Sequence, residues 1–305
     1  MSDGAIDQQG ARRAERIAGL MAVAEQMRPE LHRYCARLMG SVIDGEDVVQ
    51  DSLTRALVAV DEMQDIETLR PWLFRVAHNR ALDLLRGRAI RVAEPMEAAD
   101  DIADDTAEDA AEAMMRKEAI RTAVSRFAEL PIPQRSILIL KDVLDEPLAE
   151  IAALLGLTVD SVKAHLARAR ARLSEINAVA EARPVARPAS EAVARYVSLF
   201  NQRDWDGLRA LLAEDVRLHQ SAHPIRVGSA DVGMFFSIYA EMKDVRLAPA
   251  WLEGREVIAV FDGEGDPQPR YFMWLNWRDG KISFIRDYRY VRYVVADAEL
   301  VLVPT

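Results

Sequence analysis

Residues 150–173 read EIAALLGLTVDSVKAHLARARARL, a stretch that predicts two helices joined by a tight turn. We expect the first helix over Pro147–Leu155, a Gly-Leu-Thr turn over 156–158, and the second helix over Val159–Leu173. Thr158 is a favourable N-cap for the second helix, because a threonine hydroxyl can accept a hydrogen bond from a free amide of the first turn. The pattern is that of a helix-turn-helix.

At 100° per residue the second helix divides into two faces. One is an apolar stripe that would pack on the rest of its domain, formed by Val162, Leu166, Ala169 and Leu173. The other lies about a quarter-turn away and carries Ser161, His165, Arg168 and Arg172. Such a face can enter a major groove, where residues near the helix N-terminus meet base edges and the later arginines meet phosphates. The alternative is a solvated charged face on an ordinary helical hairpin.

Residues 47–88 carry a second helical pattern and read DVVQDSLTRALVAVDEMQDIETLRPWLFRVAHNRALDLLRGR. We expect helices over 12–40, from Asp44 or Asp47 to about Val60, and from about Thr68 to Arg88. Arginine and asparagine on the last helix can hold a splayed single strand of DNA by its phosphates and base edges. An exposed basic surface without DNA is the alternative. Trp72 and Phe74 are interpreted as core residues rather than stacking platforms.

The formal net charge of −10 conceals an uneven distribution. Residues 75–91 carry five arginines against Asp83, and residues 163–172 carry Lys163 and three arginines without an acid. The segment 92–112 holds nine acids and no base. Local patches rather than net charge decide where phosphates bind. The single cysteine, Cys35, excludes an internal disulfide and is interpreted as a small core residue.

The two patterns together resemble the promoter-binding regions of a bacterial extracytoplasmic-function (group IV) sigma factor. The resemblance implies a sigma region 2 helical bundle, a sigma region 4 helix-turn-helix and action on RNA polymerase at promoters. Partners would be core polymerase, through its β′ clamp helices and β flap, and promoter DNA. The acidic segment resembles the connector that threads through polymerase, where its acids could mimic nucleic-acid phosphates; a plain solubilising tether is the alternative.

The same resemblance assigns site residues, and each assignment is an expectation. Core polymerase binding would fall to Asp47, Gln50, Asp51 and Arg55. Recognition of the −10 element would fall to Arg75, His78, Asn79, Arg80, Arg86 and Arg88. Recognition of the −35 element would fall to Thr158, Ser161, Lys163, His165, Arg168 and Arg172.

From Ser190 onward the pattern changes to two helices, over 191–203 and Asp206–Ala213, followed by strand-like segments. Strands are expected over Val216–Gln220, Arg246–Leu252, Glu256–Phe261, Arg270–Arg278 and Lys281–Val291, with a helix around Asp231–Met242. Asp279-Gly280 is a strong hairpin signal. The segment 197–216 (VSLFNQRDWDGLRALLAEDV) resembles the opening of a SnoaL-like, NTF2-like domain, which in some such sigma factors modulates activity.

This third domain implies an α+β cone that can enclose an apolar pocket. Candidate pocket residues are His219, Tyr239, Trp274 and Asp287, where an acid could abstract a proton. The alternative is that Asp287 pairs with a neighbouring arginine on a strand surface. We expect no metal site, because a four-residue strand step from Asp215 to His219 separates the side chains by roughly 13 Å. We also expect no cofactor and no catalysis; a small ligand or self-association of the cone is open.

The sequence therefore predicts a multidomain protein with two all-α domains followed by an α+β cone. The expected boundaries are 12–91, an acidic linker over 92–112, 113–180, a proline-rich linker over 181–189, and 190–295. No stretch approaches the roughly 20 apolar residues of a membrane helix, and the N-terminus lacks a signal-peptide core, so a cytoplasmic location without membrane contact is expected. The competing classes are a SnoaL-like enzyme fused to a DNA-binding module and a helix-turn-helix regulator that does not bind core polymerase.

Overall fold

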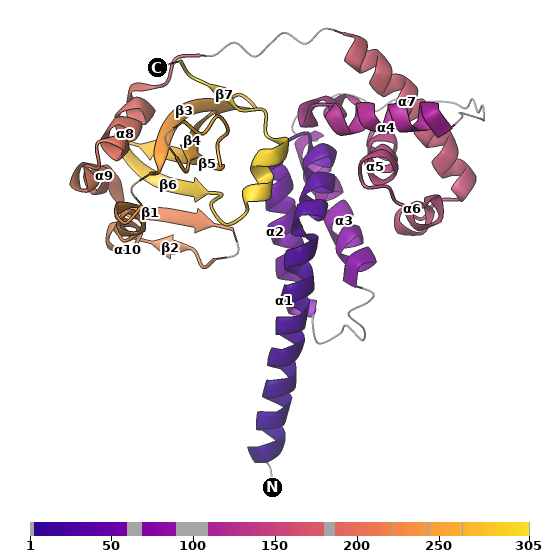
Figure 1. Ribbon diagram of the computed structural model, residues 1–305. Coiled ribbons are helices and arrows are strands. Elements are labelled where there is room, and N and C mark those ends of the chain that lie inside the picture. The colour runs from indigo at the N-terminus through magenta and orange to yellow at the C-terminus, as the bar shows by residue number, and fades with distance from the viewer. Residues whose placement is uncertain are drawn as a thin grey trace. The chain divides into compact units, whose positions relative to one another are not determined.

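The structure is a computed structural model that describes residues 3–59, 69–89, 109–179, 187–221, 223–242, 244–263 and 265–304 (Figure 1). Within these ranges, side chains are described except at 3–12 and 109–111. The chain divides into two compact units, Met1–Ala180 and Glu181–Thr305. The first is helical and the second contains the sheet. This confirms the predicted arrangement of all-α helices followed by an α+β cone. The acidic residues 92–108 and the linker residues 181–186 lie outside the described ranges.

The first half of unit 1 is a bundle of three helices, α1 (Asp3–Met39), α2 (Val42–Val58) and α3 (Leu69–Ala89). Ser41 begins α2, because its hydroxyl accepts a hydrogen bond from the amide of Asp44 at 3.1 Å. Gly45 lets α2 cross α1 closely: a Cβ on this residue would lie 2.5 Å from the Ala36 Cα. The buried face of α2 includes Val48, Val49 and Leu53.

The second half of unit 1 is a run of shorter helices: α4 (Asp109–Arg121), η3 (Val124–Glu129), α5 (Ile132–Leu138), η4 (Ile139–Val143), α6 (Leu148–Leu155) and α7 (Val159–Ala178). α5 continues directly into η4, where the backbone widens to π geometry and the Leu144 amide bonds to the Ile139 carbonyl. Gly156 ends α6 in the left-handed region, at φ 69°. Thr158 then caps α7 by accepting from the Ser161 amide at 3.2 Å, as predicted.

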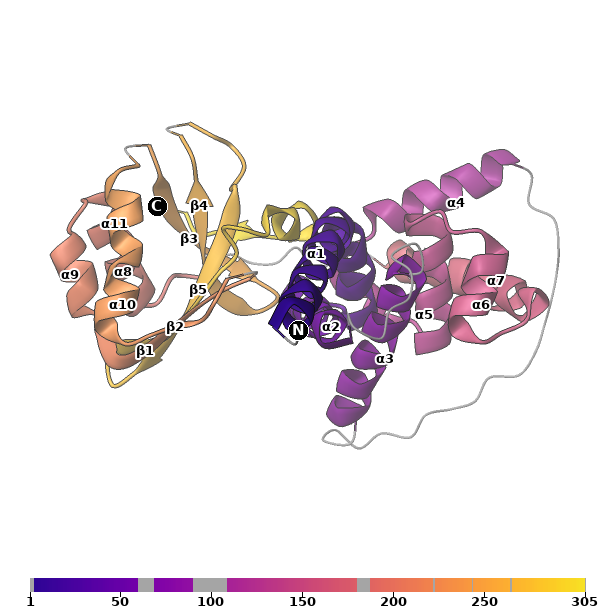
Figure 2. The ribbon, with the colours of Figure 1, turned by 90° about the horizontal axis from the view of Figure 1, so that it is seen from below.

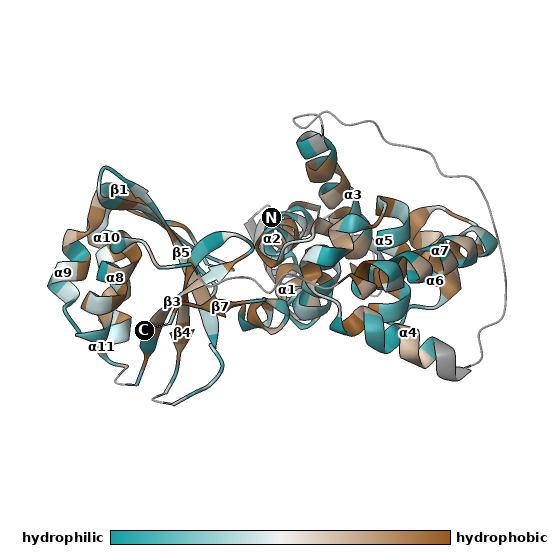
Figure 3. Cartoon of the chain, turned by 90° about the horizontal axis from the view of Figure 1, so that it is seen from above, coloured by the Kyte–Doolittle hydropathy of each residue, from teal (hydrophilic) through white to brown (hydrophobic). Residues whose placement is uncertain are grey.

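Both halves of unit 1 share one hydrophobic core, in which buried residues from α1, α2 and α3 join buried residues from α5, η4, α6 and α7. Figure 3 shows the apolar residues of these helices gathered on their facing sides. The residue that ends α1, Gly40, lies at this junction with φ 69°. A Cβ on Gly40 would approach the Cβ of Ala128 in η3 to 2.7 Å. Gly40 is therefore constrained by its backbone and by the neighbouring half.

Unit 2 is an antiparallel sheet with one parallel pair, covered by helices. Its helices are α8 (Glu191–Asn201), α9 (Trp205–Ala210), α10 (Ser229–Gly233), α11 (Phe235–Ala240) and η5 (Arg292–Asp297). Its strands are β1 (Leu212–Gln220), β2 (Arg226–Val227), β3 (Arg246–Leu252), β4 (Arg255–Phe261), β5 (Tyr271–Arg278), β6 (Lys281–Asp287) and β7 (Val301–Leu302). The strand order is β2-β1-β6-β5-β4-β3-β7, and β1 runs parallel to β6. Figure 2 shows α8 to α11 on one side of this sheet.

Side chains from the helices and from one face of the sheet form the core of unit 2. Phe200 and Tyr239 pack edge to face with ring centroids 5.2 Å apart, and Leu218 and Ile285 belong to the same cluster. The predicted hairpin is confirmed: Asp279 and Gly280 both have positive φ, and Arg278 pairs with Lys281. The sheet therefore fixes which residues face the helices.

Several predicted boundaries in unit 2 are wrong. β1 begins at Leu212, so residues predicted as the end of a helix are strand. β6 ends at Asp287 rather than Val291, because the Val291 amide turns back to the Tyr288 carbonyl. The helix predicted around 231–242 is two short helices. Within the described ranges, no helix is both long enough and apolar enough to cross a membrane.

We predict that Gly40→Ala destabilises unit 1 far more than Gly156→Ala. Both glycines have φ near 69°, but a Cβ on Gly156 meets nothing within 4 Å. Gly156→Ala should therefore cost only the left-handed strain, about 1 kcal/mol. Gly40→Ala adds the overlap with Ala128 and should cost about 3 kcal/mol. Urea unfolding of the full chain followed by far-ultraviolet circular dichroism measures both, and equal losses would contradict the close contact at Gly40.

Candidate nucleic-acid and polymerase interfaces

The second helix of the helix-turn-helix, α7, packs through the predicted stripe. Val162, Leu166, Ala169 and Leu173 are all buried, which confirms the predicted packing face. The stripe continues to Ile176. The orientation of α7 is thus set by hydrophobic burial, which leaves its other side open to solvent.

The polar side of α7 carries the predicted −35 residues in different environments. Lys163 and Arg172 are exposed, and Arg172 pairs with Glu175 at 2.9 Å. Half-buried His165 and Arg168 lie together, with Arg168 Nη2 3.4 Å from His165 Nδ1. Burial and the Arg168 charge lower the pKa of His165, so its ring is neutral at pH 7 and offers one donor and one acceptor. The Thr158 hydroxyl is engaged as the N-cap.

Arg170 lies on the same helix but belongs to the interior of unit 1. Its guanidinium donates to both carboxylate oxygens of buried Asp142, at 2.7 and 2.9 Å, and to Glu112 at 3.0 Å. These hydrogen bonds raise the pKa of Arg170 despite burial. The charge pattern alone counted Arg170 within the basic patch. On α7, however, Arg170 lies beside the apolar stripe residues Ala169 and Leu173, and this position indicates that its side chain points inward.

The helix that carries the predicted −10 residues, α3, presents Arg75, Asn79, Arg86 and Arg88 to solvent. Arg86 makes a loose pair with Asp83 at 3.7 Å on the same helix. Phe74 is buried and Trp72 is partly buried against the core, as predicted. The exposed set can therefore contact a nucleic acid without unfolding the bundle.

His78 is half-buried and is bonded to α1 of the bundle. Its Nδ1 lies 2.8 Å from the hydroxyl of fully buried Tyr34 on α1. Burial, together with the charge of Arg86, lowers the pKa of His78 to about 4. The bond to Tyr34 occupies one ring nitrogen of half-buried His78, and its assignment to the −10 set stays a prediction.

The predicted polymerase-binding residues line the solvent side of α2. Asp47 and Arg55 are exposed, and Gln50 and Asp51 are half-buried. Asp51 accepts a hydrogen bond from Arg80 Nε on α3 at 2.7 Å and forms an ion pair with Arg80 Nη2 at 2.7 Å. Two turns earlier, Asp44 pairs with Arg88 at 2.9 Å. Asp51, assigned to polymerase, and Arg80, assigned to DNA, therefore hold each other across α2 and α3.

In unit 2 a polar cluster lies inside the cone on the face covered by helices. The carboxylate of fully buried Asp287 accepts from Gln220 Nε2 at 2.8 Å and from the Arg289 amide at 3.0 Å. The hydroxyls of buried Tyr239 and Tyr271 are 2.5 Å apart. Burial raises the pKa of both tyrosines, and so does the nearby Asp287. The sequence missed Gln220 and Tyr271, although the alternation of their strands points both inward.

The structure does not bring the four predicted pocket residues together. Asp287 pairs in register with Gln220 and Met273, whereas Arg286 pairs with His219 and Trp274. Because successive strand residues point to opposite faces, His219 and Trp274 lie on the other face of the sheet from Asp287. There Arg286 Nη1 contacts His219 Nδ1, and Trp274 packs on Phe284. Only Tyr239 and Asp287 share the interior.

We predict a pH-dependent stability difference between the wild type and Asp287→Asn. Burial raises the pKa of Asp287 to about 6, against hydrogen bonds from Gln220 and the Arg289 amide. The folded state thus binds this proton more tightly, so the stability contribution present at low pH is lost as pH rises through about 6. Between about pH 4.5 and 7.5, the free energy of unfolding of Asp287→Asn should therefore rise by about 2 kcal/mol relative to that of the wild type.

Urea unfolding at both pH values measures this difference. Asp206→Asn also removes one carboxylate of unit 2, at a position that is 97% exposed, and is the matched control. The difference in free energy of unfolding between Asp206→Asn and the wild type should be the same at both pH values. A constant difference for Asp287→Asn as well would show that the buried carboxyl titrates normally.

Comparison with known proteins gives three family matches along the chain. Residues 23–91 match Sigma-70 region 2, residues 121–173 match Sigma-70 region 4, and residues 193–285 match the SnoaL-like domain. The two sigma ranges include all of α2, α3, α5 and α6, and the SnoaL-like range includes all of β1 to β5.

Curated relatives and a solved structure are similar to this chain. The ECF RNA polymerase sigma factor SigG of Mycobacterium tuberculosis is 33% identical over 226 residues, covering 66% of this chain and 61% of SigG. RNA polymerase sigma factor CnrH of Cupriavidus metallidurans is 34% identical over 140 residues, covering 44% of this chain and 73% of CnrH. The crystal structure of the extracytoplasmic function sigma factor SigJ of Mycobacterium tuberculosis aligns with 90% of this chain and 98% of SigJ, at 21% identity and a TM-score of 0.35. Because the SigG match covers 61% of that protein, this chain spans less than two thirds of the length of SigG. With both sigma regions present in order and a SnoaL-like domain after them, the chain belongs to the family of extracytoplasmic-function RNA polymerase sigma factors.

Proposed function

We propose that this protein binds core RNA polymerase and directs transcription initiation at a specific set of promoters. The observation that carries the proposal is the presence, in one chain and in this order, of two helices with exposed basic and amide groups. These are α3, with Arg75 and Asn79, and α7, with Lys163 and Arg172. The protein would act in the cytoplasm, where core polymerase meets the chromosome.

The −10 element would be bound by α3 as a separated single strand. Guanidinium groups pair with phosphates, and asparagine can hydrogen-bond a base edge that is free of its partner strand. The strand would first contact the exposed side chains of Arg75, Asn79 and Arg86. Arg80 and Arg88 would join after their pairs with Asp51 and Asp44 are released.

The −35 element would be bound by α7 in the major groove. Ser161 and His165 lie near the helix N-terminus and would meet base edges, while Lys163, Arg168 and Arg172 would meet phosphates. Thr158 would contribute through its backbone position, since its hydroxyl caps the helix. The same sequence order supports the proposed domain division at 12–91, 113–180 and 190–295, with linkers over 92–112 and 181–189.

Polymerase binding would use the solvent side of α2. Asp47, Gln50, Asp51 and Arg55 would contact the β′ clamp helices, while the helix-turn-helix domain would contact the β flap. A regulator that only binds duplex DNA has no use for such a surface or for strand-opening residues on α3. The presence of this helix argues against that class.

The cone would modulate the activity of the sigma domains without catalysing a reaction of its own. Its interior carboxylate, Asp287, already accepts hydrogen bonds from Gln220 and the Arg289 amide, so it is held rather than offered to a substrate. A small ligand or self-association would be the input. The alternative is a SnoaL-like enzyme tethered to DNA, and turnover of a substrate by residues 190–305 would favour it.

We predict that Arg172→Gln and Arg170→Gln fail in different ways. Arg172 is exposed, so its loss should weaken holoenzyme binding to a −35 duplex about threefold to tenfold and reduce the salt dependence by about one phosphate contact. Arg170→Gln leaves the buried Asp142 carboxylate without its partner and should cost about 3 kcal/mol of stability. Binding at several salt concentrations and urea unfolding separate the two effects. A destabilised Arg172→Gln would count against its proposed DNA contact.

We predict that the full chain and a version ending at Ala180 both start run-off transcription with core polymerase, at different rates. Promoters would come from upstream of the protein's own gene. Unit 1 has its own hydrophobic core, so the shortened chain should fold. The sign of the rate difference gives the sign of modulation by the cone. If neither version binds core polymerase in a pull-down, the proposed function is wrong.

A further inference from the structure

A cavity in unit 1 lies between α3 and α6 and has a volume of about 140 Å³. Its inner lining is apolar and consists of Phe74, Leu140, Ile151 and Leu154. The first three are no more than 2% exposed and belong to the core of unit 1. Since an apolar cavity of about 150 Å³ can hold a benzene ring, this cavity has room for one phenyl or branched alkyl group.

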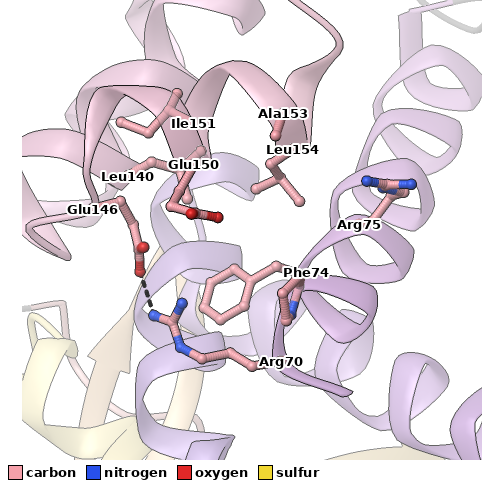
Figure 4. A pocket seen from close by; sticks show the side chains of 10 residues that line it. Arg70, Phe74, Arg75, Leu140, Glu146, Glu150, Ile151, Ala153 and Leu154 are labelled. Carbon is pink, nitrogen blue, oxygen red and sulfur yellow. Dashed lines mark hydrogen bonds and ion pairs between the residues drawn. The ribbon is translucent and has the colours of Figure 1, made fainter. Parts of the chain in front are cut away.

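The cavity opens to solvent at a mouth that carries two opposite charges. Exposed Arg75 of α3 and exposed Glu150 of α6 both line it. Figure 4 shows these two charged groups on opposite sides of Leu154. Among the residues that the structure describes, neither side chain has a hydrogen-bond or ion-pair partner. The mouth therefore presents one cation and one anion to a molecule that fills the cavity.

The other two charged groups of the lining, Arg70 and Glu146, already have partners. Arg70 pairs with Glu146 and, at 2.5 Å, with Glu30 of α1. Its guanidinium also lies over the Phe74 ring, 5.0 Å from the ring centroid. This end of the cavity is occupied by interactions within the protein, so the charges of a ligand find partners at the mouth.

The charges at the mouth favour a zwitterion over a simple anion or cation. An anion bound to Arg75 would be repelled by Glu150, and a cation bound to Glu150 would be repelled by Arg75. A molecule with both charges gains two charge-assisted hydrogen bonds. An α-amino acid carries its carboxylate and its ammonium on one carbon, so both can stay at the mouth while the side chain enters the cavity.

The apolar lining then selects among amino acids. Glycine and alanine leave the cavity unfilled, whereas a branched alkyl group or a phenyl ring removes much more apolar surface from water. A charged or amide side chain would lose its hydration without gaining a partner among Phe74, Leu140 and Ile151. The class that fits is therefore an amino acid with a branched aliphatic or aromatic side chain.

We propose that this cavity binds a free α-amino acd of that class. Its carboxylate pairs with Arg75, its ammonium pairs with Glu150, and its side chain packs against Phe74 and Ile151. Because Arg75 belongs to the proposed −10 set, a bound amino acid takes this guanidinium from the promoter strand and lowers transcription. That consequence rests on the proposed function, whereas the binding site itself does not.

Isothermal titration calorimetry of the full chain with L-leucine tests the site. A ligand of this size with two charged contacts should bind with a Kd on the order of 0.1 mM. Two analogues each lack one charge: 4-methylpentanoate has no ammonium, and leucinamide has no carboxylate. Each should bind about tenfold more weakly than leucine. So should alanine, which keeps both charges but leaves the cavity unfilled.

Two substitutions at the mouth should separate the two charged contacts. Glu150→Gln should weaken leucine binding about tenfold, but it should not weaken the binding of 4-methylpentanoate, which has no ammonium to lose a partner. Arg75→Gln should weaken leucine binding about tenfold without weakening that of leucinamide. A substitution that only distorts the cavity would weaken all three ligands alike, so this pattern identifies direct contacts.

Arg33→Gln and Glu129→Gln are the matched controls, because both residues are exposed in unit 1 and do not line the cavity. Each should leave leucine binding unchanged. The proposal is overturned if leucine does not bind at about 10 mM, or if its binding survives both Arg75→Gln and Glu150→Gln. Binding of 4-methylpentanoate or leucinamide as tight as that of leucine also overturns it.

Run-off transcription with core polymerase tests the consequence for activity. Saturating leucine should lower the rate of the wild type about threefold to tenfold, and at the same concentration it should lower the rate of Glu150→Gln far less. An unchanged wild-type rate would overturn the inhibition. If the chain fails to bind polymerase at all, the proposed function falls, while calorimetry of the free chain still decides the binding site.

Discussion

The buried cation of Arg135, satisfied by backbone carbonyls from both halves of unit 1, is the constraint on which the helical unit depends. Its carbonyl partners Leu38, Ala128 and Leu130 fix the end of α1 against η3 and α5. An unpartnered guanidinium in the same place would carry a large desolvation cost. Gly40 is required beside it because only a residue without a Cβ fits both the left-handed turn and the contact with Ala128. One local arrangement thus aligns the two halves and their recognition helices.

Ion pairs decide how much of the basic charge is available to DNA. Arg80 and Arg88 are held by acids of α2, and Arg170 is held by Asp142 and Glu112. The cations left exposed are fewer than the sequence pattern suggests. The exposed pairs are individually weak and exchange readily with other partners. With a net charge of −10 and partly neutralised patches, the free chain is expected to bind DNA weakly by itself.

In the interior of the cone, too, polar groups are occupied by partners within the same unit. Sheet register sends Asp287 and Gln220 to the face covered by helices and sends His219 and Trp274 to the opposite face. The interior polar groups then satisfy one another, as the short contact between Tyr239 and Tyr271 shows. A buried polar network of this kind favours one arrangement of the core.

The sequence by itself determined the elements and their order. The stripe of α7, the Thr158 cap, the Asp279-Gly280 hairpin and the strands at 246–252 and 281–287 all follow from local periodicity and turn chemistry, which depend on neighbours in the chain. Only the tertiary structure decided the roles of particular charges. His78 and Arg170 occur in basic, apparently exposed patterns, yet they are turned inward to Tyr34 and Asp142. These partners lie 44 and 28 residues away, and no local pattern specifies such a contact. The contacts of Arg70 with Glu146 and of Arg135 with the Leu38 carbonyl could not be predicted for the same reason, because they join segments that are far apart in the sequence.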